Sequence, residues 1–265
     1  MNPKKDKKII PVIVLVTYLL MITINSLANI IPINGRGTGD VSDAYTNLFA
    51  PAALTFAIWG LIYLLLFAYS IYQISNRTKM NLSLKTVLDR IGVVFAISSI
   101  ANVVWIFAWH YDIIWLSLIM MLCILICLIY INLILRNQSL SRNNVYLIKL
   151  PFSIYFGWIT VATIANITTF LVSIGWNLFG INELIWTSII IIIGCLIGIL
   201  AMNHFSSISY GAVIIWAYCG ILIKHVSESG FNGQYSSIII VVTISLVLLV
   251  LSEIFLVLKR LKNND

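Results

Sequence analysis

Residues 113–135 read IIWLSLIMMLCILICLIYINLIL, a stretch of 23 residues without a charged side chain between Asp112 and Arg136. A helix needs about 20 apolar residues to cross roughly 30 Å of hydrocarbon, so this stretch is long enough to span a membrane. It lacks the alternating hydrophobicity, over about ten residues, that marks the strands of a membrane barrel. Because backbone polar groups in lipid must be satisfied internally, the stretch is predicted to be a transmembrane helix.

The same pattern recurs along the whole chain. Of its 265 residues 61% are hydrophobic and only 9% are charged, whereas about 25% are charged in a typical soluble domain. These values exclude a soluble enzyme, a soluble nucleic-acid-binding domain and a disordered chain. The predicted fold is all-α, a polytopic transmembrane bundle of about eight spans. The spans are predicted at 9–32, 51–74, 91–109, 113–135, 147–173, 184–203, 207–224 and 237–258.

Basic residues predict how the chain is oriented. With an even number of spans, 14 of the 16 Lys and Arg residues fall on one side, while Arg36 and Lys224 fall on the other. We therefore expect a multi-pass protein of the cell membrane with both termini in the cytoplasm. The net charge of +7 then follows from topology, and no nucleic-acid partner is expected. The 14 residues are Lys4, Lys5, Lys7, Lys8, Arg77, Lys79, Lys85, Arg90, Arg136, Arg142, Lys149, Lys259, Arg260 and Lys262.

The first apolar stretch has a second interpretation. Lysines, an apolar run and then Ser26-Leu27-Ala28 also fit a secretory signal with its cleavage site. Cleavage would leave seven spans and would break the agreement between span number and charge.

Reactive chemistry is sparse in this sequence. The four cysteines lie inside predicted spans without metal-binding spacing, and the three histidines lie at the ends of different spans. Glu253 is the one acidic residue expected inside a span, and it can reach Lys259 and Arg260 at the cytoplasmic side. The scarcity of intramembrane charge argues against an ion-coupled transporter. We expect no catalytic residues and no metal ligands, and a membrane enzyme would lack a reactive group beyond Trp, Tyr and His.

Tryptophan and asparagine point to a binding site. The chain has eight tryptophans, and four of them are predicted to lie deeper than an interfacial aromatic belt. A buried indole N–H needs an acceptor, so the deep indoles favour a partly polar cavity open to the outside. Alternatively, these rings fill gaps between helices, and the buried amides bond one helix to another.

Helical spacing sharpens this hypothesis. Three sets of residues each fall on one helical face, and two of the sets add an amide to the aromatic rings. Such a lining suits a flat, mostly apolar ligand with polar edges. The sets are Phe56, Trp59 and Tyr63; Asn102, Trp105 and Trp109; and Trp158, Ala162 and Asn166.

The same residues carry a family resemblance. Residues 49–63, FAPAALTFAIWGLIY, resemble the start of the second helix in the TspO/MBR family of tryptophan-rich sensory or translocator proteins. Asn102, Trp105 and Trp109 resemble that family's third-helix pattern. Pro151 followed by Trp158, Ala162 and Asn166 resembles its fifth-helix pattern. The resemblance covers roughly residues 10–175, so the chain is identified as an extended relative of this five-helix family.

The resemblance implies a five-helix core over residues 1–175, with three additional helices over residues 176–265. It also implies a pocket capped by the first loop that binds porphyrins or similar hydrophobic molecules, with no cofactor required beyond such a porphyrin- or haem-like ligand. The loop sequence at residues 34–40, NGRGTGD, reads as a series of turns. Arg36 in this loop could meet a ligand carboxylate or belong to a solvated turn.

Two main functional hypotheses follow. In the first, the protein binds a planar tetrapyrrole-like ligand as a sensor or carrier, with the lipid bilayer and a small molecule as its partners. In the second, it is a small-molecule permease without ion coupling. The last three helices are expected to support the core from outside, where they could replace a dimer contact, so a monomer or a homodimer is expected.

Overall fold

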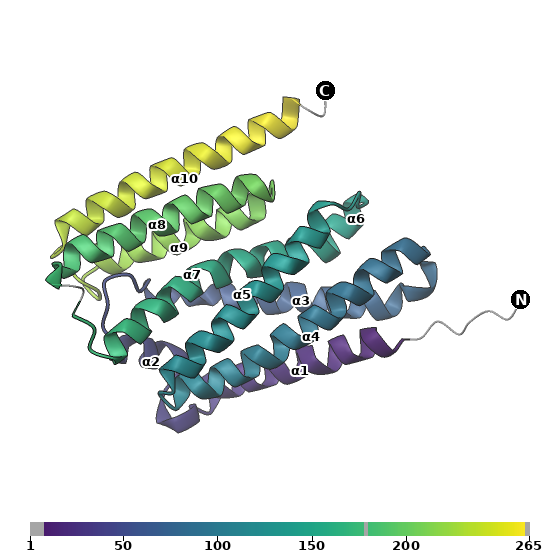
Figure 1. The fold of residues 1–265 in the computed structure, drawn as a ribbon, viewed down its shortest axis with the longest axis horizontal. Helices are drawn as coiled ribbons and strands as arrows, with labels where there is room; N and C mark the ends of the chain where they lie inside the picture. The colour runs from purple at the N-terminus through teal and green to yellow at the C-terminus, as the bar shows by residue number, and fades with distance from the viewer. Residues whose placement is uncertain (1–7, 178–179, 263–265) are drawn as a thin grey trace, which may run out of the picture. The chain divides into compact units, whose positions relative to one another are not determined.

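The computed structural model describes residues 8–177 and 180–262. Lys4, Lys5 and Lys7, which count toward the predicted orientation, lie outside the described residues. Within the described ranges all regular elements are helical and no strand occurs. The predicted all-α class is therefore confirmed (Figure 1).

Eight helical stretches in the described part are long and apolar enough to cross a membrane, so each predicted span corresponds to one of them. The spans run over Ile9–Ile30, Ala53–Ser75, Leu82–His110, Ile114–Arg136, Arg142–Ser173, Glu183–His204, Ile208–Val226 and Ser236–Lys262. The elements are α1 (Ile9–Ile30), η1 (Ile33–Gly35), α2 (Thr38–Ala44), η2 (Ala53–Ala57), α3 (Ile58–Ser75), η3 (Arg77–Lys79), α4 (Leu82–His110), α5 (Ile114–Arg136), α6 (Arg142–Asn144), η4 (Val145–Lys149), α7 (Leu150–Ser173), α8 (Glu183–His204), α9 (Ile208–Val226) and α10 (Ser236–Lys262).

Helix α4 begins nine residues before the apolar run predicted for it. Asn81 caps its start, because the Asn81 side chain accepts a hydrogen bond from the Leu84 N–H at 2.8 Å. The added turns carry charged residues, among them Lys85 and Asp89. Hydropathy marks only the part of a helix that suits lipid, so it does not detect this polar extension.

The surface of α10 is typical of a helix facing lipid. Large apolar side chains, including Ile240, Ile244, Leu251 and Phe255, are exposed on it. A soluble protein rarely exposes such a continuous apolar strip. Together with the eight spans, this strip identifies a multi-pass membrane protein.

The first of two compact units comprises residues 1–38 and 59–152. Helix α4 packs against α1 and α5 in it. A side chain at Gly92 would lie 2.8 Å from Ile10 Cγ2 and 2.9 Å from Val14 Cγ2, so a glycine there lets α1 approach closely. Farther along, the rings of Tyr69, Phe95 and Phe152 meet edge to face with centroids 4.7–5.9 Å apart.

The second compact unit comprises residues 39–58 and 153–265. Helix α10 lies along both α8 and α9 (Figure 1). Helix α7 meets α9 at Gly157, where an added Cβ would lie 2.9 Å from Val213 Cβ. Near this contact the Tyr210 hydroxyl donates to Thr160 Oγ1 at 3.2 Å. The fifth span is thus bound to α9, along which α10 also lies.

These units divide the chain differently from the expected boundary at residue 175, because α7 from Ser153 onward belongs to the second unit. A π-helical turn, Val145–Lys149, precedes this point. Pro151 follows it and lacks a backbone N–H, and a π turn is one way in which a helix accommodates such a loss. The five-helix core remains a prediction about which helices bind the ligand.

Candidate functional site

Four aromatic side chains of the first unit form a continuous series, which we call the aromatic row. Tyr63 stacks on Trp59 with centroids 5.4 Å apart and planes at 22°. Trp59 lies 6.3 Å from Trp105, which stacks on Trp109 at 6.0 Å and 22°. Helical spacing in α3 and α4 places each pair on one face, and the fold brings the two faces together. Trp105 and Trp109 are buried, whereas Trp59 and Tyr63 are half-buried, so the accessible ring surface of the row lies at its α3 end.

An amide pair lies one turn from the row. Asn102 is fully buried, and its Oδ1 accepts a hydrogen bond from Asn25 Nδ2 at 2.7 Å. The Asn25 amide also donates to the Met21 carbonyl at 2.8 Å. This interhelical bond between α1 and α4 matches the structural interpretation of the buried amides.

The loop after α1 is tied to the end of α4 around His110, which is fully buried. His110 Nδ1 donates to the Ile33 carbonyl at 3.1 Å, and its Nε2 lies 3.2 Å from Thr38 Oγ1. Trp109 Nε1 donates to the Thr38 carbonyl at 3.1 Å, so one indole of the row holds the loop backbone.

Arg36 belongs to the same loop and forms an ion pair with Asp112 just beyond α4. A ligand carboxylate at Arg36 would therefore compete with Asp112.

The expected series of turns in this loop is only partly correct. Residues 33–35 form a 3-10 turn and Thr38–Ala44 forms the short helix α2, so half of the glycine-rich stretch is helical.

The remaining predicted residues lie in the second unit. Phe56 packs edge to face on Trp158, with centroids 5.7 Å apart and planes at 82°. Trp158 and Asn166 are buried, and Ala162 is half-buried. Asn166 Nδ2 donates to the Ala162 carbonyl at 3.1 Å, one turn back in α7. The fold thus joins Phe56 to the α7 face as a second aromatic contact.

Residues 39–58, which we call the docked segment, lie along α9. Trp216 Nε1 donates to the Thr55 carbonyl at 3.0 Å, and the Ala52 N–H donates to the Gly220 carbonyl at 3.0 Å. Farther along, His225 Nε2 donates to the Leu48 carbonyl at 2.9 Å. Three polar groups of one helix therefore hold the segment's backbone.

The approach is closest at Gly220. A Cβ there would lie 1.9 Å from Thr55 Oγ1 and 2.8 Å from Thr55 Cβ. No side chain fits in that space unless the segment moves away from α9.

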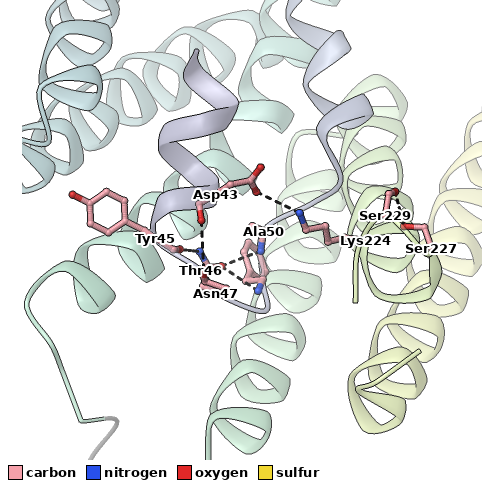
Figure 2. A network of polar contacts seen from close by, with 9 residues as sticks. Asp43, Tyr45, Thr46, Asn47, Ala50, Lys224, Ser227 and Ser229 are labelled. Atoms are coloured by element: carbon pink, nitrogen blue, oxygen red, sulfur yellow. Dashed lines mark hydrogen bonds and ion pairs between the residues drawn. The ribbon is translucent and has the colours of Figure 1, made fainter. Parts of the chain in front are cut away.

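An ion pair completes the docking. Lys224 Nζ lies 3.3 Å from Asp43 Oδ1, and Asn47 Oδ1 accepts from the N–H groups of Phe49 and Ala50 (Figure 2). A cavity of about 200 Å³ lies beside this pair. The charges of Lys224 and Asp43 neutralise each other, so this cavity has little net charge to attract an ionic ligand.

A larger cavity of about 300 Å³ lies elsewhere in the second unit. Parts of the docked segment, the end of α7 and the start of α8 line it. We call it the indole cavity, because Trp176 and Trp186 lie on its wall with ring centroids 4.7 Å apart and planes at 74°. Its lining comprises Asn47, Leu48, Phe49, Thr168, Leu171, Val172, Gly175, Trp176, Glu183, Trp186, Thr187 and Ile190. From the sequence both tryptophans fit an interfacial belt, so the cavity is a finding of the structure.

Arg77 carries a buried charge that the sequence does not reveal. It is only 5% exposed and its Nη2 lies 2.7 Å from Asp89 Oδ2. Its Nε and Nη1 atoms have no hydrogen-bond partner among the described residues. The sequence pattern makes Arg77 a loop charge, but the polar extension of α4 encloses it.

The described residues contain no cluster of three or more His, Cys, Asp or Glu side chains able to hold a metal ion. The four cysteines are free thiols, of which Cys127 and Cys195 are buried and Cys123 and Cys219 are half-buried.

The sequence matches the model of the TSPO-like protein family over residues 11–255. This chain belongs to the TSPO-like protein family. No curated protein and no solved structure matches it.

The family match extends beyond the resemblance seen in the sequence. That resemblance ends near residue 175, whereas the match continues through α8 and α9 into α10. The last three helices of this TSPO-like protein are thus part of the family pattern. Their close contacts with α7 at Gly157 and with the docked segment at Gly220 give a physical reason for this.

The ten predicted site residues form two groups in this TSPO-like protein. The aromatic row, Asn102 and Arg36 belong to the first unit, and Phe56, Trp158, Ala162 and Asn166 belong to the second. None of the ten lines the indole cavity or the smaller cavity beside Lys224. Their role in ligand binding stays a prediction.

Proposed function

We propose that this TSPO-like protein binds a planar, mostly apolar ligand of the porphyrin or tetrapyrrole class and acts as a sensor or carrier. Family membership supports a membrane protein that binds or moves a ligand. The aromatic row carries the proposal, because four rings in sequence supply the flat surface on which a macrocycle stacks.

The neighbouring polar groups fit such a ligand. Trp59 and Tyr63 are only half-buried, so part of the row's ring surface is open to a partner. The loop that ends at Thr38 adjoins Trp109 through a hydrogen bond, which suits a cap over that end of the row. Arg36 could bind a ligand propionate only by giving up its ion pair with Asp112. We therefore assign Arg36 a secondary role.

Titration of the purified protein with protoporphyrin IX tests the site. Binding should quench tryptophan emission saturably in the wild-type protein. Trp59→Leu and Trp105→Leu should each weaken binding by roughly threefold to tenfold, since loss of one ring contact costs about 0.5–1.5 kcal/mol. The matched control is Trp115→Leu, because Trp115 is exposed on α5. Equal affinity in all four proteins would reject this site.

Reconstituted vesicles separate the sensor from the carrier and from the permease. A carrier or an uncoupled permease should equilibrate porphyrin across the bilayer at a rate proportional to protein content. A sensor should bind the ligand and leave the flux unchanged.

We further propose that the protein resides in the cell membrane with both termini cytoplasmic, as the Lys and Arg distribution indicates. Reporter fusions at either terminus test this orientation. Size-exclusion chromatography with light scattering distinguishes the expected monomer from a homodimer.

A further inference from the structure

The indole cavity has a chemistry that the porphyrin proposal does not use. Among the described residues, its lining includes one carboxylate, Glu183, and no Lys, Arg or His. We propose that it binds a small organic cation bearing a methylated ammonium group, such as choline. This inference is independent of the proposed function, because no residue of the aromatic row lines the cavity.

Ring geometry is the first argument. The indoles of Trp176 and Trp186 stand nearly perpendicular, at 74° and 4.7 Å between centroids, so they form a corner rather than a stack. Phe49 also lines the cavity. Ring faces attract cations electrostatically, and aromatic cages of this kind recognise quaternary ammonium groups. A planar ligand would instead need parallel surfaces.

Charge is the second argument. Glu183 is exposed, so it lies where the cavity meets the surface. It forms no ion pair with any described residue, whereas Asp43 of the docked segment is paired with Lys224. A carboxylate at the start of α8 also suits the helix dipole. That structural role does not account for the two indoles that line the same cavity. A carboxylate that lines the cavity together with two indoles, and has no ion pair among the described residues, favours a cation.

Size and polarity are the third argument. A cavity of about 300 Å³ is at the lower end of the usual range for small-molecule sites. The buried Thr187 hydroxyl adds a hydrogen-bonding group for a polar tail. The Thr168 hydroxyl donates to the Ala165 carbonyl and can still accept a hydrogen bond. The apolar wall of Leu171 and Ile190 suits methyl groups.

Two sources could supply this ammonium group. The cavity lies where α7 ends and α8 begins, which is the depth of lipid headgroups for two spans. The group could therefore belong to a phosphocholine lipid or to a free solute.

The test is calorimetric titration of the full-length protein in a maltoside detergent with choline chloride, against sodium chloride at equal ionic strength. Wild-type protein should bind choline saturably. It should bind 3,3-dimethylbutanol, the uncharged isostere of choline, at least roughly tenfold more weakly. Equal affinity for the isostere would overturn the proposal, since the site would then select shape without charge.

Variants locate the site. Glu183→Gln and Trp186→Leu should each weaken choline binding by roughly tenfold. Glu228→Gln is the matched acid control, because Glu228 does not line the cavity, and Trp115→Leu is the matched indole control. Glu183 is exposed, so its amide variant keeps the fold even if Trp186→Leu does not. Wild-type affinity in Glu183→Gln would overturn the proposal.

Nanodiscs then separate the two sources. In phosphatidylglycerol discs, choline should bind in either case. Loss of this binding in phosphatidylcholine discs supports a lipid headgroup as the occupant, whereas equal binding in both supports a free cation. No choline-dependent signal in either disc would overturn the proposal.

Discussion

The two compact units use tryptophan in different ways. In the first unit, Trp59 and Trp105 contact other rings along the aromatic row. In the second unit, Trp216 donates its N–H to a distant backbone carbonyl, and Trp176 with Trp186 lines a cavity. A tryptophan count alone therefore does not reveal whether a ring stacks on another ring, holds a loop or lines a cavity.

The difference also separates two kinds of ligand chemistry. The aromatic row offers parallel surfaces and neutral amides, which suit a large flat molecule. The indole cavity offers a perpendicular corner and a carboxylate, which suit a small cation. Substitutions in each unit can reveal whether the two units, which differ in ligand chemistry, also unfold independently.

Truncation after Ser173 should have the largest effect. It removes α8, α9 and α10, and so exposes the face of α7 that meets Val213 and Tyr210. The docked segment also loses every bond to α9. We expect the truncated chain to aggregate in detergent by size-exclusion chromatography. A monodisperse product that binds porphyrin would instead support an independent five-helix core over residues 1–175.

Among single substitutions, Gly220→Ala should damage the fold severely. Its Cβ would overlap Thr55, a β-branched residue that cannot turn away. Overpacking of this kind costs about 1–3 kcal/mol, and it should release the docked segment. Thermal unfolding monitored by thiol labelling at Cys219 measures the loss. Gly60→Ala is the control, since nothing lies within 4 Å of a Cβ there, and it should not destabilise the protein.

Asp89→Asn tests the buried charge of the first unit. The substitution leaves the Arg77 guanidinium enclosed without its counter-ion. Asp89 is 35% exposed, so we expect a loss of about 2 kcal/mol, below the ~3–5 kcal/mol of a fully buried pair. Asp112→Asn breaks the more exposed pair with Arg36 and should cost under about 1 kcal/mol. Equal losses for both variants in chemical denaturation would contradict this ranking.

The smallest effects should reveal whether the units unfold separately. Tyr18→Phe removes a bond to the Tyr63 carbonyl in the first unit, and Tyr218→Phe removes one to the Ile191 carbonyl in the second. Each should cost about 0.6 kcal/mol, the average for polar contacts between membrane helices.

The cysteines supply a reporter for each unit, because Cys127 is buried in the first and Cys195 in the second. If the units unfold independently, each Tyr variant should accelerate thiol labelling only in its own unit. Equal acceleration at both cysteines would mean that the helices unfold as one body.

Local patterns make most of the fold predictable. Apolar runs identify all eight spans, and helical spacing correctly places Trp105 and Trp109 on one face. The docked segment is not predictable in this way, because Leu48 and His225 meet across 177 residues and no local pattern encodes that pairing. The indole cavity escapes prediction because Trp176 and Trp186 fit an interfacial belt equally well. The burial of Arg77 is not predictable either, because hydropathy does not detect the charged extension of α4 whose Asp89 pairs with Arg77.

Long-range docking also has a consequence for synthesis of the protein. Thr55 emerges from the ribosome 161 residues before Trp216, the side chain that holds its carbonyl. At about 5–20 residues per second this interval lasts roughly 10 to 30 seconds. Throughout that time the segment at residues 39–58 has none of its α9 partners. The nascent chain must therefore keep the segment in water or in contact with the insertion machinery until its seventh span arrives.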